Sequence, residues 1–264
     1  MPAAEIQGVS VYYELLGQGS ETIAFLNGIA MSVAHWAPYV QAFQGEYRCL
    51  CHDMRGQTLS GKPEGEYSLD LHAQDLAELM ERLEITRVHL VGTSYGAEVA
   101  TAFAVRYPEK CLSLTLIDGV SETDSLLEAI VDSWILSAEK DARLFYRTIL
   151  PWNYSPGYIS ANRELLAKRE AGVVNLPREW FEGFIRLCTA FLKINLTESL
   201  SAIQCPTLIM VGEKDILKPY KFSKIIEQRI KGSQLFILPG AGHAAVLEEP
   251  ALIQQHLRNF LAAR

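Results

Sequence analysis

The chain lacks the features of a membrane, secreted or nucleic-acid-binding protein. No apolar stretch among its 264 residues reaches the roughly 18 residues that are needed to span a bilayer. The N-terminal residues have no basic start followed by an apolar block, so we expect no signal peptide. A net charge of -7, without any run of Lys or Arg, offers no broad attraction for nucleic acid or anionic lipid. We therefore expect neither a nucleic acid nor a membrane as a partner.

Disulfide and metal chemistry are also poorly represented. The five cysteines form an odd set without Cys-x-x-Cys spacing, and most lie in apolar runs: Cys49, Cys51, Cys111, Cys188 and Cys205. We interpret them as reduced core residues of a cytoplasmic protein, which makes a catalytic cysteine a poor candidate. His52 and Asp53 are adjacent, but neighbours in a strand point to opposite faces, and no other metal-ligand spacing is present. We expect neither a metal nor an organic cofactor.

The chain also has no repeat, low-complexity tract or evident interdomain linker. Its length suits one large α/β domain, or one domain with an insertion. Apolar runs that predict strands alternate with helical patterns, and the strands are expected at residues 9–15, 22–26, 47–52, 87–91, 111–117, 207–211 and 234–238. Strands separated by helices imply a mostly parallel sheet that is covered on both faces.

Residues 121–200 interrupt this alternation. Strand patterns are absent there, and helical patterns dominate around 126–135, 142–149, 159–169 and 178–192. Ligands of parallel α/β sheets bind at the carboxyl ends of the strands, where such an insertion would lie. We therefore expect residues 121–200 to form a helical lid over a core made of residues 1–120 and 201–264.

The expected lid is rich in aromatic residues, with 10 of the 25 in the chain. A single aromatic residue in a lid more often packs the lid onto the sheet than contacts a ligand. As a group, these side chains favour an apolar-walled pocket for a small molecule, lined by Asn27 and by the lid residues Trp134, Trp152, Trp180 and Phe184. Three basic lid residues are candidates for binding a substrate carboxylate: Arg147, Arg186 and Lys193.

Gly92-Thr93-Ser94-Tyr95-Gly96 joins an apolar strand to a helix that begins with small residues. Gly-x-Ser-x-Gly patterns are common by chance, and an ordinary glycine-rich loop would account for this one equally well. The flanking strand and helix favour a nucleophile elbow, in which a sharp turn holds a serine in a strained conformation. Glycines at 92 and 96 suit so tight a turn, because side chains there would collide. Ser94 is therefore the candidate nucleophile.

A serine hydroxyl needs an adjacent base, and His243 is the strongest candidate. It follows the last strand in a glycine-containing loop, at the sheet edge where Ser94 is expected. Asp215 follows the preceding strand and would orient the imidazole. Asp118 ends another strand at the same edge and stays open as an alternative acid, whereas Glu213 is expected to be solvated. The order Ser94, Asp215, His243 is the one expected downstream of a nucleophile elbow.

An acyl-transfer site also needs donors for the developing oxyanion. Residues 27–30 follow a strand and turn through Gly28 into a loop. The backbone N–H groups of Ile29 and Tyr95 are therefore the expected pair of donors. Because both belong to the main chain, the side chain at position 29 would mainly shape the pocket.

Taken together, these segments resemble the α/β-hydrolase superfamily, in the branch that carries a helical cap after the sixth strand. The resemblance rests on the elbow, on the turn at 53–60, and on residues 212–215 and 242–243, and it extends along nearly the whole chain. It implies a mostly parallel eight-stranded sheet with helices on both faces. Asn27 stands where the family often has histidine, and Thr58 replaces the second glycine of the turn. Within the superfamily, the chain is most similar to small esterases and enol-lactonases.

The leading hypothesis is hydrolysis of a carboxylic ester or lactone through an acyl-enzyme on Ser94. An acyltransferase or perhydrolase would use the same intermediate with another acceptor, and C–C bond hydrolysis is compatible with the same residues. Haloalkane dehalogenation is disfavoured, because that reaction needs a carboxylate nucleophile. A non-catalytic ligand receptor of the same fold is a further alternative. The substrate itself and the oligomeric state, monomer or homodimer, are left open.

Overall fold

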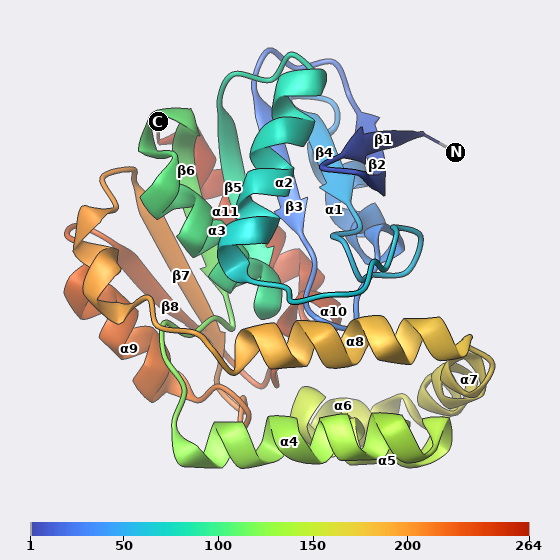
Figure 1. The fold of residues 1–264 in the computed structure, drawn as a ribbon. Coiled ribbons are helices and arrows are strands. Elements are labelled where there is room, and N and C mark those ends of the chain that lie inside the picture. The colour runs from blue at the N-terminus through green and yellow to red at the C-terminus, as the bar shows by residue number, and fades with distance from the viewer. Residues whose placement is uncertain (1, 264) are drawn as a thin grey trace.

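Eight strands form one sheet in the computed structural model, which describes residues 2–263 (Figure 1). The strands are β1 Ala3–Ile6, β2 Val9–Leu16, β3 Thr22–Leu26, β4 Arg48–His52, β5 Val88–Thr93, β6 Cys111–Ile117, β7 Thr207–Gly212 and β8 Gln234–Leu238. Their order is β1-β2-β4-β3-β5-β6-β7-β8. The pairs β1/β2 and β2/β4 are antiparallel, and all the other neighbours are parallel. The mostly parallel, eight-stranded α/β architecture is confirmed.

β1 lies outside the strands that the sequence pattern predicts. It is only four residues long, it forms the edge of the sheet, and Ile6 alone among its residues is buried. Its strand conformation comes from backbone pairing with β2, in which Ala3 lies opposite Tyr12 and Ile6 opposite Val9. A pattern search finds no apolar run in so short and exposed a strand.

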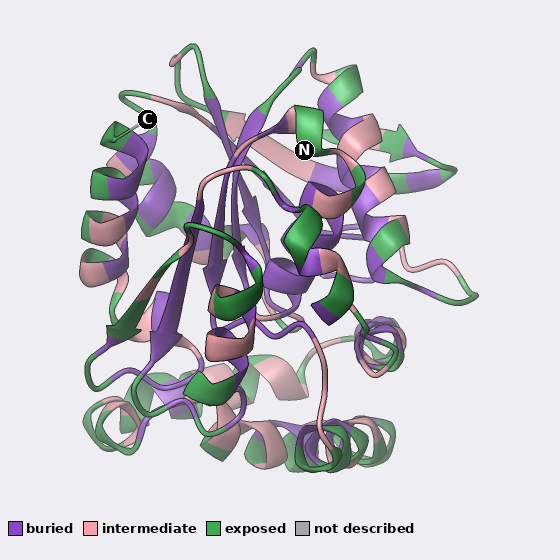
Figure 2. Cartoon of the chain, turned by 90° about the vertical axis from the view of Figure 1, so that its left-hand side faces the viewer, coloured by how far each residue is buried: buried purple, intermediate pink, exposed green. Residues whose placement is uncertain are grey.

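Helices cover both faces of the sheet, and the central strands are buried (Figure 2). One buried cluster packs the sheet against α1 Ala37–Phe43, α10 Ala245–Glu248 and α11 Pro250–Ala262. A second cluster packs it against α2 Leu69–Arg82, α3 Tyr95–Arg106 and α9 Tyr220–Arg229. Short 3-10 helices lie at Val33–Trp36, Pro108–Lys110 and Thr197–Ala202. Burial on both faces explains why β3, β5 and β7 are buried along their whole length and carry mostly apolar residues without alternation.

Five helices between β6 and β7 lie together below the carboxyl ends of the strands in the described chain (Figure 1). We call them the inserted helices: α4 Ser125–Lys140, α5 Ala142–Asn153, α6 Pro156–Ala161, α7 Arg163–Val174 and α8 Arg178–Phe191. The single helix expected at 159–169 is wrong. The chain breaks at Asn162, which has φ -117° and ψ 29° and whose Nδ2 donates to the carbonyl oxygen of Tyr158. The division into core and lid stays a prediction.

No helix within residues 2–263 combines the length and the apolar character that a membrane span requires.

One inserted helix approaches the core at a glycine. Gly183 is buried in α8, and a Cβ atom there would overlap the carbonyl oxygen of Gly56 in the loop after β4. Gly56 itself has φ 86°, a left-handed conformation that favours glycine. By contrast, a Cβ atom at Gly172 in α7 would meet nothing within 4 Å. The contact between α8 and the core therefore depends on the absence of a side chain at 183.

We expect Gly183→Ala and Gly172→Ala to change stability in opposite directions. Alanine is the better helix former by about 0.5–1 kcal/mol, so Gly172→Ala raises the free energy of unfolding by that amount. At 183 the overlap with Gly56 outweighs this gain, and overpacking costs of about 1–3 kcal/mol are expected. Denaturant unfolding of both variants tests the contact, and equal stabilisation by the two substitutions would contradict it.

Candidate active site

The turn between β5 and α3 holds Ser94 in a strained conformation. Its φ of 50° and ψ of -122° are unusual for a residue with a side chain, and such strain is frequent at functional sites. A Cβ atom at Gly92 would overlap the carbonyl oxygen of Gly96, and one at Gly96 would overlap that of Leu26. Both glycines are therefore required by the tight turn, as predicted. The backbone N–H of Ser94 donates to Ile117 over 2.9 Å and ties the turn to β6.

Ser94, His243 and Asp215 form a continuous chain of hydrogen bonds. His243 Nε2 lies 2.9 Å from Ser94 Oγ, and its Nδ1 lies 2.8 Å from Asp215 Oδ2. Because a carboxylate only accepts, Nδ1 carries the proton and Nε2 is free to accept from the serine hydroxyl. The second carboxylate oxygen, Oδ1, accepts from the backbone N–H groups of Leu217 (2.9 Å) and Lys218 (2.8 Å). The carboxylate and the ring are thus held in the orientation that a general base needs.

The two other acids considered from the sequence lie elsewhere. Asp118 is fully buried, and its Oδ1 accepts from the backbone N–H of Gly212 at 2.8 Å, while its Oδ2 has no hydrogen-bond partner among the described residues. Burial raises the pKa of Asp118 well above its usual range, and the nearby Asp215 raises it further. Glu213 is exposed and accepts from the backbone N–H of Gly240. Asp215 is the acid that contacts His243.

The expected oxyanion donors lie beside Ser94. Ile29 and Ser94 line the same cavity, and Tyr95 is the first residue of α3, where backbone N–H groups lack helical acceptors. Neither N–H has a hydrogen-bond acceptor among residues 2–263. Both groups are therefore available to an oxygen bound next to the serine.

Asn27 supports the oxyanion loop from below instead of lining the pocket. It is fully buried, and its Nδ2 donates to the carbonyl of His52 (3.2 Å), to Asp53 Oδ1 (3.1 Å) and to Gln57 Oε1 (3.1 Å). Its Oδ1 accepts from Trp36 Nε1 at 2.8 Å. The prediction of Asn27 as a pocket residue is wrong, because these bonds use the whole amide inside the core.

The turn at 53–60 connects to the same loop. Gln57 Nε2 donates to the carbonyl oxygen of Gly28 at 2.9 Å, and Asp53 Oδ1 accepts from the backbone N–H of Val33 at 2.8 Å. Burial raises the pKa of Asp53, while the hydrogen bonds that it accepts from Leu59, Val33 and Asn27 lower it. This hydrogen-bond network holds the backbone from which Ile29 would donate.

A buried ion pair beside the serine is absent from the sequence prediction. Lys218 Nζ donates to both carboxylate oxygens of Glu98 at 3.0 Å, and it lies 3.4 Å from Ser94 Oγ. The Nζ also lies 4.6 Å from the centre of the Phe191 ring. Glu98 Oε1 accepts from the backbone N–H of Val120 at 2.8 Å. One signal could have found the pair: Glu98 is the only charged residue in the small, apolar first turns of α3.

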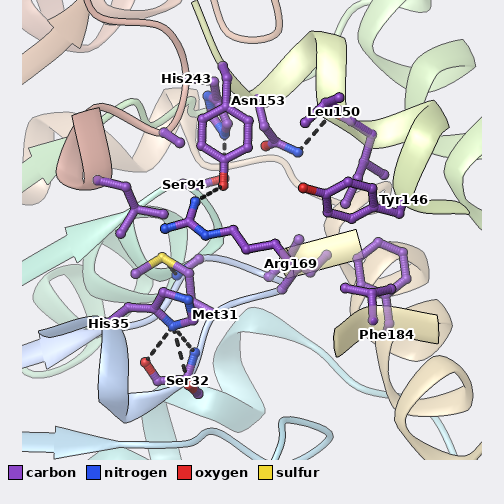
Figure 3. A pocket seen from close by; sticks show the side chains of 18 of the residues that line it. Met31, Ser32, His35, Ser94, Tyr146, Leu150, Asn153, Arg169, Phe184 and His243 are labelled. Carbon is purple, nitrogen blue, oxygen red and sulfur yellow. Dashed lines mark hydrogen bonds between the residues drawn. The ribbon is translucent and has the colours of Figure 1, made fainter. Parts of the chain in front are cut away.

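The candidate triad opens into a cavity of about 410 Å³ between the sheet and the inserted helices (Figure 3). Ser94 and His243 lie at one wall, and the predicted pocket residues Trp134, Trp180 and Phe184 line it. Trp180 and Phe184 stack with ring centres 5.7 Å apart. Trp152 does not line the cavity; it lies at the edge of the lining face of α5 and packs on the apolar core, so its prediction is wrong.

The basic residues expected to face a substrate carboxylate do not line this cavity either. Arg147 pairs with Glu170 on the surface, and Lys193 pairs with Glu66. Arg169 of α7 lines the cavity instead. In the described part of the chain, no group of three or more His, Cys, Asp or Glu side chains is arranged to hold a metal ion.

The loop that carries His243 is tied to the inserted helices. A Cβ atom at Gly242 would overlap the backbone nitrogen of Ser155, and the N–H of Ala244 donates to the carbonyl oxygen of Asn153 at 2.7 Å. Glu248 accepts from the backbone N–H of Ser155 at 2.9 Å and from its hydroxyl at 2.6 Å. These contacts join the end of α5 and the start of α6 to the loop that carries His243.

We expect Lys218→Met to destabilise the fold through Glu98. The variant leaves a buried carboxylate without its partner, at a cost of about 3–5 kcal/mol. Burial raises the pKa of Glu98, so protonation relieves this cost at low pH, and the deficit relative to wild type grows as the pH rises through the raised pKa. Chemical unfolding across pH measures both effects. Adding Glu98→Gln, which can still accept from Val120, should recover part of the loss, and simple additivity would refute the coupling.

Comparisons with known proteins agree with the fold. A family model described as the alpha/beta hydrolase fold matches residues 21–250. An alpha/beta hydrolase enzyme, MGS-M2, from a Medee basin deep-sea metagenome library has a solved structure with a TM-score of 0.95 and 30% sequence identity; the match covers 99% of this chain and 97% of that one.

Named relatives span almost the full length. The chain is 25% identical to a putative carbamate hydrolase, RutD, of Caulobacter sp. (strain K31), over 99% of this chain and 98% of the relative. It is 22% identical to 3-oxoadipate enol-lactonase 2 of Acinetobacter baylyi, over 92% of this chain and 90% of the relative. With the sheet topology and the elbow in place, the extent of the family match leads to one conclusion: the chain belongs to the α/β-hydrolase family.

Proposed function

We propose that the protein is a serine hydrolase that cleaves a carboxylic ester or lactone through an acyl-enzyme on Ser94. The observation that carries the proposal is the unbroken chain from Ser94 Oγ through His243 to Asp215, with separations of 2.9 and 2.8 Å, at the wall of an apolar cavity. Nucleophile, base and orienting acid are linked in sequence by hydrogen bonds.

In the first half of the reaction, Ser94 Oγ attacks the carbonyl carbon while His243 Nε2 accepts the hydroxyl proton. Asp215 stabilises the imidazolium through Nδ1–H. The backbone N–H groups of Ile29 and Tyr95 donate to the oxyanion of the tetrahedral intermediate. Collapse of this intermediate breaks the bond to the leaving oxygen, which takes the proton from His243 and leaves an acyl group on Ser94.

In the second half, His243 Nε2 accepts a proton from water as the water oxygen attacks the acyl carbon and forms a second tetrahedral intermediate. Collapse of this intermediate breaks the bond between the acyl carbon and Ser94 Oγ, which takes the proton back from His243, and the acid is released. The charges around the serine suit this cycle. The ammonium of Lys218 pairs with the carboxylate of Glu98, and burial raises the pKa of Asp118 well above its usual range. Asp215 contacts Nδ1 of His243 and is the carboxylate placed to offset the imidazolium. We place Lys218 as a positioning residue, because its Nζ lies 3.4 Å from Ser94 Oγ and within 3.0 Å of Glu98.

The relatives bear on the substrate class. One is named as a putative carbamate hydrolase and another as an enol-lactonase, and carbamates and lactones share with esters a carbonyl carbon that carries a leaving group. A panel of esters, lactones and carbamates of graded acyl length is therefore the direct search. Adding an alcohol or thiol acceptor separates hydrolysis from acyl transfer, because a transferase diverts the acyl group from water. Binding without turnover would instead support a receptor.

A fluorophosphonate probe tests the nucleophile. We expect wild-type protein to be labelled at Ser94, and Ser94→Ala to lose labelling and to reduce ester turnover by at least about 10⁴-fold. The measurements are intact-mass spectrometry and release of 4-nitrophenol from short-chain esters. Native protein that neither reacts with the probe nor turns over any ester would rule out the proposed function.

The paired variants Asp215→Asn and Asp118→Asn test the acid. In Asp215→Asn the new amide would hold the imidazole in the wrong tautomer, and we expect kcat to fall by about 10³- to 10⁴-fold. Asp118→Asn keeps an oxygen that can accept from Gly212 and removes a buried carboxyl that does not contact His243, so kcat should change little. Steady-state kinetics on one ester shows which of the two acids supports catalysis. The reverse ranking would assign the role to Asp118.

A further inference from the structure

Arg169 lines the catalytic cavity without an acidic partner. Within residues 2–263 it forms no ion pair, and the one hydrogen bond of its guanidinium is donated by Nη1 to Tyr154 Oη at 2.7 Å. Three other arginines of the inserted helices pair with carboxylates on the surface: Arg143 and Arg147 with Glu170, and Arg178 with Glu182. Arg169 is half-buried and lines a cavity instead of pairing with a carboxylate, so a surface ion pair does not explain its position.

The cavity wall offers Arg169 no negative charge. None of its described lining residues is Asp, Glu or Lys, so Arg169 is the one lining side chain among them that is charged at any ordinary pH. Burial lowers the pKa of His35, and the charge of Arg169 lowers it further, which favours the neutral imidazole. Burial also raises the pKa of Tyr154, and it raises that of Tyr146 to about 12, so neither hydroxyl ionises to neutralise the guanidinium.

The guanidinium is also held in place. Its carbon lies 5.7 Å from the centre of the Tyr154 ring, and that ring stacks on Tyr158 with centres 5.2 Å apart. Figure 3 shows the Arg169 side chain among the residues that line the cavity, with a hydrogen bond drawn at its guanidinium. The tyrosine contact uses one N–H group, and the other N–H groups of the guanidinium have no acceptor among the described residues. This is the geometry of a preorganised anion site.

We propose that Arg169 and Tyr154 form a carboxylate-binding subsite, so that the substrate of this enzyme carries a carboxylate in addition to its scissile carbonyl. A planar carboxylate matches the guanidinium fork, and the apolar walls strengthen the attraction by excluding water. The walls formed by Trp134, Trp180 and Phe184 would pack on the apolar segment between the two groups. This inference rests on the proposed function only in naming the carbonyl as the reacting group.

Equilibrium binding tests the subsite without turnover. Trp134 and Trp180 line the cavity, so their fluorescence can report a ligand there. We would titrate 4-phenylbutyrate and the isosteric neutral 4-phenylbutyramide into wild type, Arg169→Met, Arg169→Lys and, as a matched control, Arg147→Met. Wild type and the Arg147 variant should bind the carboxylate more tightly than the amide by about tenfold or more, the strength of one hydrogen bond between charged groups. Arg169→Met should abolish this preference, and Arg169→Lys should restore part of it.

Turnover gives a second readout. The ratio of kcat/KM for the mono-4-nitrophenyl ester of glutaric acid to that for 4-nitrophenyl pentanoate should be high in wild type and should fall in Arg169→Met. An unchanged binding preference in Arg169→Met, or none in wild type, overturns the subsite. If the binding preference depends on Arg169 but no ester is cleaved, the subsite stands and the proposed function falls. Thus the two proposals fail separately.

Discussion

The close packing of the β5–α3 turn on the end of β3 is the constraint on which the site depends. Gly96 lies so near the carbonyl oxygen of Leu26 that no side chain fits between them. This contact holds Ser94 at φ 50°, and the residues directly after Leu26 form the loop that carries Ile29. The serine and one expected oxyanion donor are therefore located by a single backbone contact, and neither can move without disturbing the other.

The ionisable groups around Ser94 differ in their burial and in their hydrogen-bond partners. Asp118 and Asp215 follow neighbouring strands, yet Asp118 is enclosed with one unbonded oxygen and a raised pKa, whereas Asp215 accepts two backbone N–H groups and faces His243. The two carboxyl groups thus have different surroundings, and burial disfavours the charged form of Asp118. Lys218 and Glu98 are also buried, and each charge offsets the cost of burying the other.

The sequence predicts the architecture and the meeting of Ser94, Asp215 and His243 because these depend on local patterns and on the rule that parallel strands end at one edge. It fails for Asn27, because the side chain of Asn27 forms hydrogen bonds with residues that are distant in the sequence. It also fails for Trp152, because the direction of that side chain depends on how α5 packs. It also misses Lys218 and Arg169. A lone basic residue becomes informative only when its neighbours are known to be acidic, as at Glu98, or apolar, as in the cavity.

The ties between the His243 loop and the inserted helices bear on how a ligand reaches the serine. Swinging α4–α8 outward as a rigid unit would break the Ala244–Asn153 and Ser155–Glu248 hydrogen bonds and pull on the imidazole. An open state of that kind would lack an aligned base. The enzyme would then be inactive whenever the inserted helices swing out to admit a ligand. Movement of side chains along α7 breaks none of these bonds. Arg169 takes part in none of these bonds, and its guanidinium donates to Tyr154 Oη, so its side chain can move while His243 stays aligned.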